Sequence, residues 1–178
     1  ILATLFCSTL STQSFTAIGT VNPAKYIPEQ KMIAFGSNGM VTTQHYLATK
    51  VGEDILNQGG NAYDAAIAIS FTLAVVLPRA GNIGGGGFMV LHDIKSKKNY
   101  AIDYREKAPL LSTTDMYLDE NGTVIPNKST LGYLSSGVPG TVAGMWAVHQ
   151  KFGSMEWKKL LRPAIKLASD GFKISPYM

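Results

Sequence analysis

The sequence predicts an α+β fold in which a small antiparallel sheet is covered by helices. Apolar residues recur at helical spacing on both sides of the middle of the chain, and the middle itself shows the two-residue alternation of strands. Four consecutive glycines separate the first helical region from the strands. The expected order of helix, helix, hairpin, helix, helix suggests a layered arrangement.

Two helices are expected in the first half of the chain. Apolar side chains recur at four-residue steps from about residue 43, and Gly59 and Gly60 end this run. Asn61 is a good N-cap for a second helix, in which Asp64 lies at the third position, where the helix dipole favours a negative charge. This second helix is apolar on nearly every side, which predicts a buried helix. It is shorter than the roughly 20 residues that a membrane span needs.

Two strand-like runs lie between Pro78 and Pro109. Side chains alternate along each run, and residues 95–98 form a polar turn between them, so the pair is typical of a β-hairpin. The hairpin would bring Arg105 to the end of its second strand, before Pro109 stops that strand.

The four glycines that precede the hairpin are Gly84, Gly85, Gly86 and Gly87. Because a glycine inside regular structure costs roughly 0.5–1 kcal/mol relative to alanine, such a run indicates a backbone that another group must approach closely. The run lacks the spacing of a phosphate-binding or dinucleotide-binding loop, and a helix precedes it where a strand would be needed. We expect close packing against another backbone, or the lining of a ligand cavity.

Shorter elements are expected at three places. Residues 32–35 and 40–42 have the composition of short strands, and residues 112–117 resemble the start of a short helix.

Two further helices are expected near the end of the sequence. Thr141 is expected to cap a helix that ends at Gly153, and Ser154 is expected to cap a last helix that ends at Gly171. Pro163 lies inside the last helix and should kink or split it.

The composition limits the class of protein. The charged fraction is 16%, below the roughly 25% of typical soluble domains, which suggests a large buried area shared with a partner or with further sequence. The net charge is +4, but the basic residues are scattered, so we expect no nucleic-acid partner. The single Cys7 and three widely spaced histidines predict neither a disulfide nor a metal site, and no cofactor is expected.

Residues 1–17 carry no charge and resemble the apolar middle of a secretory signal peptide. We therefore expect an exported protein, periplasmic or extracellular. A disordered or membrane-anchoring tail is the alternative interpretation.

Arg105 is the candidate binding residue, and two interpretations of it remain open. It could form a structural ion pair with Asp103, Glu106 or another carboxylate. Alternatively, its guanidinium could bind a substrate carboxylate through two parallel hydrogen bonds, with Asp103 and Glu106 orienting it. Arg79 could be a second anion contact or a surface residue. The sequence shows no GxSxG motif, Cys–His pair or metal cluster, so no catalytic residue is assigned.

Four segments, in this order and spacing, resemble the γ-glutamyltransferase (glutathione hydrolase) family: GGNAYDAAIAISFTLAVVLP, AGNIGGGGFM, AIDYREKAP and SGVPGTVAG. The resemblance covers residues 39–171. It implies an N-terminal-nucleophile hydrolase with a four-layer αββα core. Residues 18–178 would be the N-terminal portion of the large subunit, and therefore an incomplete part of that fold.

The resemblance also implies a mechanism. A precursor would cut itself into two subunits, and the threonine exposed at the start of the small subunit would attack the γ-glutamyl amide of glutathione. The γ-glutamyl group would then pass to water or to an amine. Arg105, in the DYRE segment, would bind its α-carboxylate. The threonine and the oxyanion hole would lie outside these 178 residues, so we expect this polypeptide alone to be inactive.

Three alternatives remain. A β-lactam acylase and a poly-γ-glutamate depolymerase would share the fold, and a non-catalytic binding domain could derive from it. Arg105 in its DYRE setting argues for an amino-acid-like γ-glutamyl group with a free α-carboxylate.

Overall fold

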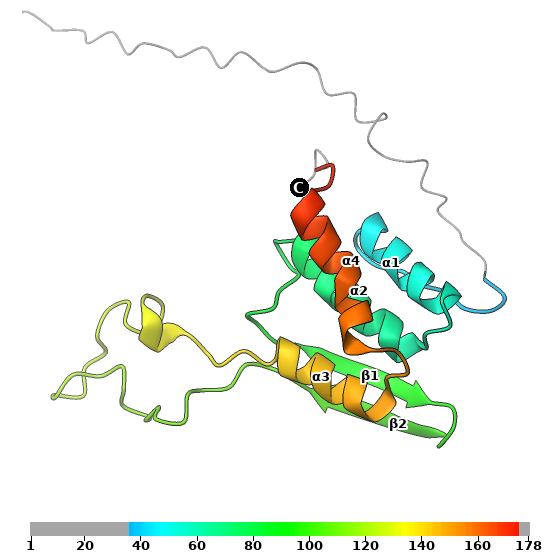
Figure 1. Ribbon diagram of the computed structural model, residues 1–178. Helices are drawn as coiled ribbons and strands as arrows, with labels where there is room; N and C mark the ends of the chain where they lie inside the picture. The colour runs from blue at the N-terminus through cyan, green and yellow to red at the C-terminus, as the bar shows by residue number, and fades with distance from the viewer. Residues whose placement is uncertain (1–35, 175–178) are drawn as a thin grey trace, which may run out of the picture. The chain divides into compact units, whose positions relative to one another are not determined.

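The computed structural model describes residues 36–174, and all of these except the last belong to one compact unit. The predicted signal segment 1–17 and the strand expected at residues 32–35 lie outside the described residues. Figure 1 shows the elements in chain order: α1 (Tyr46–Asn57), α2 (Ala62–Val76), β1 (Phe88–Asp93), β2 (Lys98–Asp103), the short 3₁₀ helix η2 (Tyr133–Ser135), α3 (Thr141–Phe152) and α4 (Trp157–Asp170). The predicted order of helix, helix, hairpin, helix, helix is confirmed.

Helix α2 is the centre of the helical layer, because it packs against α1, α3 and α4. Every residue of α2 except Ala62 is at least partly buried, which confirms the prediction of a helix buried nearly all round. Its start is also as predicted: Asn61 and Asp64 form a reciprocal capping box. None of the helices in the described part of the chain combines the length and hydropathy needed to cross a bilayer.

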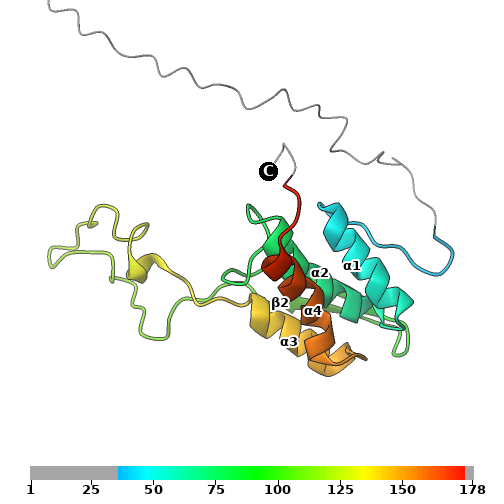
Figure 2. The same cartoon turned by 45° about the horizontal axis from the view of Figure 1, so that its top comes forward.

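Strands β1 and β2 pair antiparallel over their whole length and form the predicted hairpin. Met89, Leu91 and Ile102 face the helices, and Leu91 is buried. Phe88 and Val90 lie on the opposite face and are exposed. Figures 1 and 2 both place α3 alongside the hairpin, so the helices cover one face of this two-stranded sheet.

Two predicted short elements are wrong. Residues 40–42 form no strand, because no neighbouring strand in the described residues pairs with them. Residues 112–117 form successive turns instead of a helix: the N–H of Met116 bonds to Thr113, and that of Leu118 to Asp115. Such a short segment gains too few hydrogen bonds to offset the cost of helix nucleation.

The ends of the last two helices also differ from the prediction. Thr141 is the first residue of α3 and not its cap, since its hydroxyl donates to Asn82. Ser154 binds Asp64 instead of capping α4, whose N-cap is Glu156. The expected ends at Gly153 and Gly171 are confirmed. Helix α4 runs through Pro163 as one helix and is not split: it packs against α2, and Leu160 and Ala164 are buried on either side of the proline.

Candidate functional site

The backbone around Arg105 continues the hairpin beyond β2. The N–H of Tyr104 donates to the carbonyl of Gly87 at 3.0 Å, so the pairing extends one residue past the strands. Lys107 then exchanges two backbone hydrogen bonds with Val138, at 3.1 and 2.8 Å. Arg105 therefore lies on a stretch of backbone that is hydrogen-bonded on both sides of it.

Three glycines from two distant segments pack directly against this stretch. A Cβ atom on Gly86 would lie 2.7 Å from both the Arg105 Cα and the Tyr104 carbonyl oxygen. A Cβ atom on Gly140, just before α3, would overlap the same carbonyl oxygen, and one on Gly144 would overlap the Tyr104 side chain. Glycine is therefore the residue that these positions accept, and the Tyr104–Arg105 backbone is enclosed between them.

The four glycines of the predicted run differ in role. The contacts of Gly86 confirm the expected close packing against another backbone, and Gly87 faces the Tyr104 ring. The carbonyl of Gly85 accepts the N–H groups of Gly140 and Thr141, at 2.8 and 3.0 Å. At Gly84, however, an added Cβ would meet nothing within 4 Å in the described structure. The expectation of close packing is therefore wrong for Gly84.

The guanidinium of Arg105 is open to ligands. Its side chain is 68% exposed, and its Nε lies 3.9 Å from Glu106 Oε2. Glu106 is the only acidic side chain among residues 36–174 that lies within 4.0 Å of it. An exposed ion pair of this kind contributes little to stability. The guanidinium also lies 6.0 Å from the centroid of the Phe88 ring.

Asp103 contacts Arg105 in a different way from Glu106. Its Oδ1 accepts a hydrogen bond from the backbone N–H of Arg105 at 2.9 Å and has no ion pair with the guanidinium. Of the two carboxylates expected to orient Arg105, Asp103 therefore fixes the backbone and Glu106 makes a loose side-chain contact.

A hollow of about 310 Å³, which we call the Arg105 hollow, lies beside this side chain. It is lined by Ile102, Asp103, Tyr104, Arg105, Lys107, Val138, Pro139, Gly140, Ala143, Gly144 and Ala147. The α3 wall consists of glycines and alanines, which leave room for a ligand. Two cationic residues and one acidic residue line it, which favours an anionic group. Arg79 is exposed and does not line this hollow.

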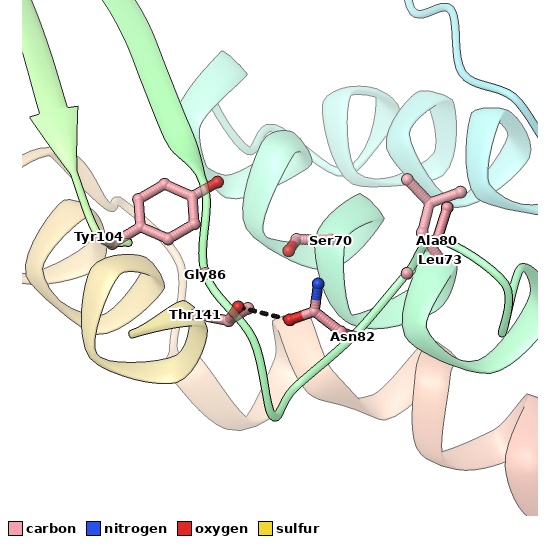
Figure 3. Close-up of a pocket in the computed structure, with 8 residues that line it drawn as sticks. Ser70, Leu73, Ala80, Asn82, Gly86, Tyr104 and Thr141 are labelled. Carbon is pink, nitrogen blue, oxygen red and sulfur yellow. Dashed lines mark hydrogen bonds between the residues drawn. The ribbon is translucent and has the colours of Figure 1, made fainter. Parts of the chain in front are cut away.

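A second hollow of about 160 Å³, the Asn82 hollow, lies between α2, the glycine loop and α3 (Figure 3). It is lined by Ser70, Leu73, Ala80, Gly81, Asn82, Gly86, Tyr104 and Thr141. Asn82 Oδ1 accepts hydrogen bonds from the Thr141 hydroxyl at 2.7 Å and from the Gly85 N–H at 2.9 Å. Burial raises the pKa of Tyr104, so its hydroxyl is neutral at physiological pH. In the described residues, no three histidine, cysteine or acidic side chains gather as metal ligands.

Sequence reasoning missed the residues that connect these parts. Asn82 stands three residues before Gly85, a spacing at which its side chain can bond the loop backbone. This spacing is the sequence signal that could have predicted the role of Asn82. Gly140, the N-cap of α3, and Gly144 are four residues apart, which places them on the same side of the helix. Their contact with Tyr104 joins segments that no sequence pattern links.

Comparison with known proteins agrees with this architecture. The family model described as Gamma-glutamyltranspeptidase matches residues 48–178. A glutathione hydrolase proenzyme of Pseudomonas sp. (strain A14) is 53% identical over 135 residues, which are 76% of this chain and 23% of that protein.

Two solved structures are also similar. The Helicobacter pylori gamma-glutamyltranspeptidase matches with a TM-score of 0.73 and 52% identity, over 79% of this chain and 40% of that one. A gamma-glutamyltranspeptidase from Pseudomonas nitroreducens complexed with L-DON matches with a TM-score of 0.72 and 50% identity, over 80% of this chain and 42% of that one.

The 178-residue chain spans about a quarter of the length of the curated relative that it matches. The similarity of fold and sequence confirms the predicted α+β class, as part of the N-terminal-nucleophile hydrolase fold. The chain belongs to the gamma-glutamyltranspeptidase family.

Proposed function

We propose that the full-length gene product cleaves γ-glutamyl amides such as glutathione, and that Arg105 binds the α-carboxylate of the γ-glutamyl donor. The observation that carries this proposal is that Arg105 combines a fixed backbone with an exposed side chain. Its backbone is enclosed by Gly86 and Gly140, while its guanidinium is 68% exposed beside a hollow with small walls. The name of the similar Pseudomonas protein, glutathione hydrolase proenzyme, supports the choice of substrate.

We expect the reacting amide of the donor to be attacked by a residue that does not belong to these 178 residues. A threonine hydroxyl at the start of a small subunit would attack the γ-carbonyl carbon, form an ester and release the amine, which takes up the proton. Water or a second amine would then break the ester and regenerate the hydroxyl. Arg105 would hold the other end of the donor through two charge-assisted hydrogen bonds and so fix the γ-carbonyl in position.

Substitution of Arg105 tests this assignment. In Arg105→Lys the ammonium cannot form two parallel bonds to a carboxylate. We expect kcat/KM for a γ-glutamyl donor to fall about thirtyfold, which corresponds to about 2 kcal/mol. Arg79→Lys is the matched control and should leave kcat/KM unchanged, because Arg79 is exposed and lies outside the hollow. An unchanged kcat/KM in Arg105→Lys would remove Arg105 from the site.

A substrate panel separates the alternatives. Turnover of glutathione supports the proposal, preferential cleavage of a β-lactam side-chain amide supports an acylase, and cleavage of poly-γ-glutamate supports a depolymerase. Donor binding without any turnover would support a non-catalytic binding domain. The 53% identity with a protein named glutathione hydrolase proenzyme favours the first outcome.

Maturation and export are part of the same proposal. A two-subunit enzyme should appear as two bands on a denaturing gel after expression, and substitution of the threonine at the cleavage junction should leave one band. Fractionation of the native host should recover the protein in the periplasm or the medium.

A further inference from the structure

We propose that Asn82 is a positioning residue for Arg105. This inference rests on the proposed role of Arg105 in binding the donor carboxylate. Asn82 does not line the Arg105 hollow, so it would act on the donor only through the backbone that carries Arg105.

The Asn82 side chain joins two segments that are far apart in the sequence. Its Oδ1 accepts the Thr141 hydroxyl, 59 residues later in the chain, at 2.7 Å (Figure 3). The same oxygen accepts the N–H of Gly85 at 2.9 Å. Because a backbone N–H can only donate, the second bond fixes which end of the amide is the oxygen. One atom therefore holds both the glycine loop and the first residue of α3.

Each of the two joined segments supplies one of the glycines that enclose the Tyr104–Arg105 backbone. The glycine loop continues into Gly86, where an added Cβ would lie 2.7 Å from Arg105 Cα. The start of α3 supplies Gly140, which lies against the Tyr104 carbonyl. The Gly85 carbonyl adds two backbone hydrogen bonds between the same segments, and Gly85 is the residue whose N–H donates to Asn82.

Loss of the Asn82 oxygen should therefore let the loop and α3 move apart, and Arg105 would shift with them. A displacement of about 1 Å at a group that orients a substrate can lower a rate by about a hundredfold. The effect should appear with a donor that carries the α-carboxylate, since this is the group that Arg105 would hold.

The test uses the full-length gene product and two donors, a γ-glutamyl amide and its analogue with an α-carboxamide in place of the α-carboxylate. We expect Asn82→Ala and Thr141→Val to lower kcat/KM for the carboxylate donor about ten- to a hundredfold. The carboxamide donor should be nearly unaffected. Asn82→Asp and Thr141→Ser keep the acceptor and the donor hydroxyl, so both should restore wild-type kinetics. Asn99→Ala, which removes another paired asparagine from the far end of the hairpin, is the matched control and should leave both donors unchanged.

Unchanged kinetics in Asn82→Ala and Thr141→Val, or an equal loss with both donors, would overturn the inference. Arg105→Ala separates this failure from failure of the proposed function. If Arg105→Ala abolishes the preference for the carboxylate donor while Asn82→Ala retains it, only the role of Asn82 is wrong. If Arg105→Ala retains the preference, the proposed function of Arg105 is wrong. Should Asn82→Ala fail to fold, the Thr141→Val and Thr141→Ser pair decides the question alone.

Discussion

Asp64 and Arg105 are two charged side chains that the protein treats in opposite ways. Asp64 is completely buried, and its carboxylate accepts hydrogen bonds from the Ser154 hydroxyl and from the N–H groups of Asn61, Ser154 and Met155. The Arg105 side chain is 68% exposed, and its nearest acidic partner among residues 36–174 is 3.9 Å away.

The difference distinguishes a structural charge from a binding charge. All the hydrogen-bonding capacity of Asp64 is used to join the start of α2 to the segment between α3 and α4. Arg105 has a fixed backbone, but its guanidinium keeps donors free for a ligand. Substitution of Asp64 should therefore lower the stability of the protein and should not distinguish the two substrate donors. Substitution of Arg105 should instead affect recognition of the donor carboxylate.

The largest expected effect is that of Asp64→Ala. It leaves the Ser154 hydroxyl and several N–H groups without an acceptor in a buried place, so the free energy of unfolding should fall by about 3 kcal/mol or more. Urea denaturation measures this, with Asp54→Ala as a control that removes an exposed carboxylate and should change little. Equal effects of the two substitutions would contradict the structural role of Asp64.

The pH dependence of stability sharpens the same point. Burial by itself raises the pKa of Asp64, but the hydrogen bonds from Ser154, Asn61 and Met155 outweigh burial and lower the pKa below its ordinary value of 3.8. A group whose pKa is lower in the folded state stabilises the fold above its unfolded pKa. This contribution is lost as the pH falls through the folded-state pKa. The stability difference between the wild type and Asp64→Asn should thus be constant down to about pH 4 and shrink below it. A difference that stays constant at lower pH would contradict the lowered pKa.

Two glycines of one run provide the next test, on the Arg105 side of the comparison. In Gly86→Ala the added methyl would lie 2.7 Å from Arg105 Cα, so unfolding free energy should fall by about 1–3 kcal/mol and kcat/KM for the donor should fall too. In Gly84→Ala the methyl meets nothing within 4 Å, and stability should change by less than about 0.5 kcal/mol. Similar losses in the two variants would show that the enclosure of Arg105 is not what Gly86 provides.

The smallest effect is expected at His45, a buried residue whose side chain caps α1 through one hydrogen bond. Its Nδ1 accepts the N–H of Leu47 at 3.3 Å and caps α1, which only the neutral ring can do. Burial lowers the pKa of His45 from its ordinary value of 6.5. Its contribution is therefore complete above pH 6.5 and is lost as the pH falls through the lowered pKa. His45→Ala should lose about 1 kcal/mol at neutral pH, while His45→Asn should keep the cap without this pH dependence. Thermal unfolding at several pH values measures this dependence in both variants. If the pH dependence persists in His45→Asn, it does not come from the His45 cap.

Features that depend on near neighbours in sequence could be predicted. The capping box of Asn61 and Asp64 spans four residues, and the hairpin follows from alternation on either side of a short polar turn. The place of Arg105 at the end of the hairpin follows from the same pattern. In these segments the local preferences of the sequence agree with the packed structure.

Features that depend on tertiary contacts could not be predicted. Ser154 and Thr141 both have the chemistry of helix caps, but each hydroxyl binds a partner far away in the sequence, 90 and 59 residues distant. A hydroxyl next to a helix start can serve the helix or a distant acceptor, and only the packed structure decides between them. The enclosure of Arg105 by Gly86 and Gly140 could not be predicted for the same reason.

A double-mutant cycle between Arg105 and the donor carboxylate tests the central claim most directly. It compares kcat/KM of the wild type and Arg105→Ala with the carboxylate donor and with its carboxamide analogue. If the guanidinium binds the carboxylate, the wild type should prefer the carboxylate donor about thirtyfold or more, and Arg105→Ala should show almost no preference. A preference that Arg105→Ala retains in full would contradict the claim.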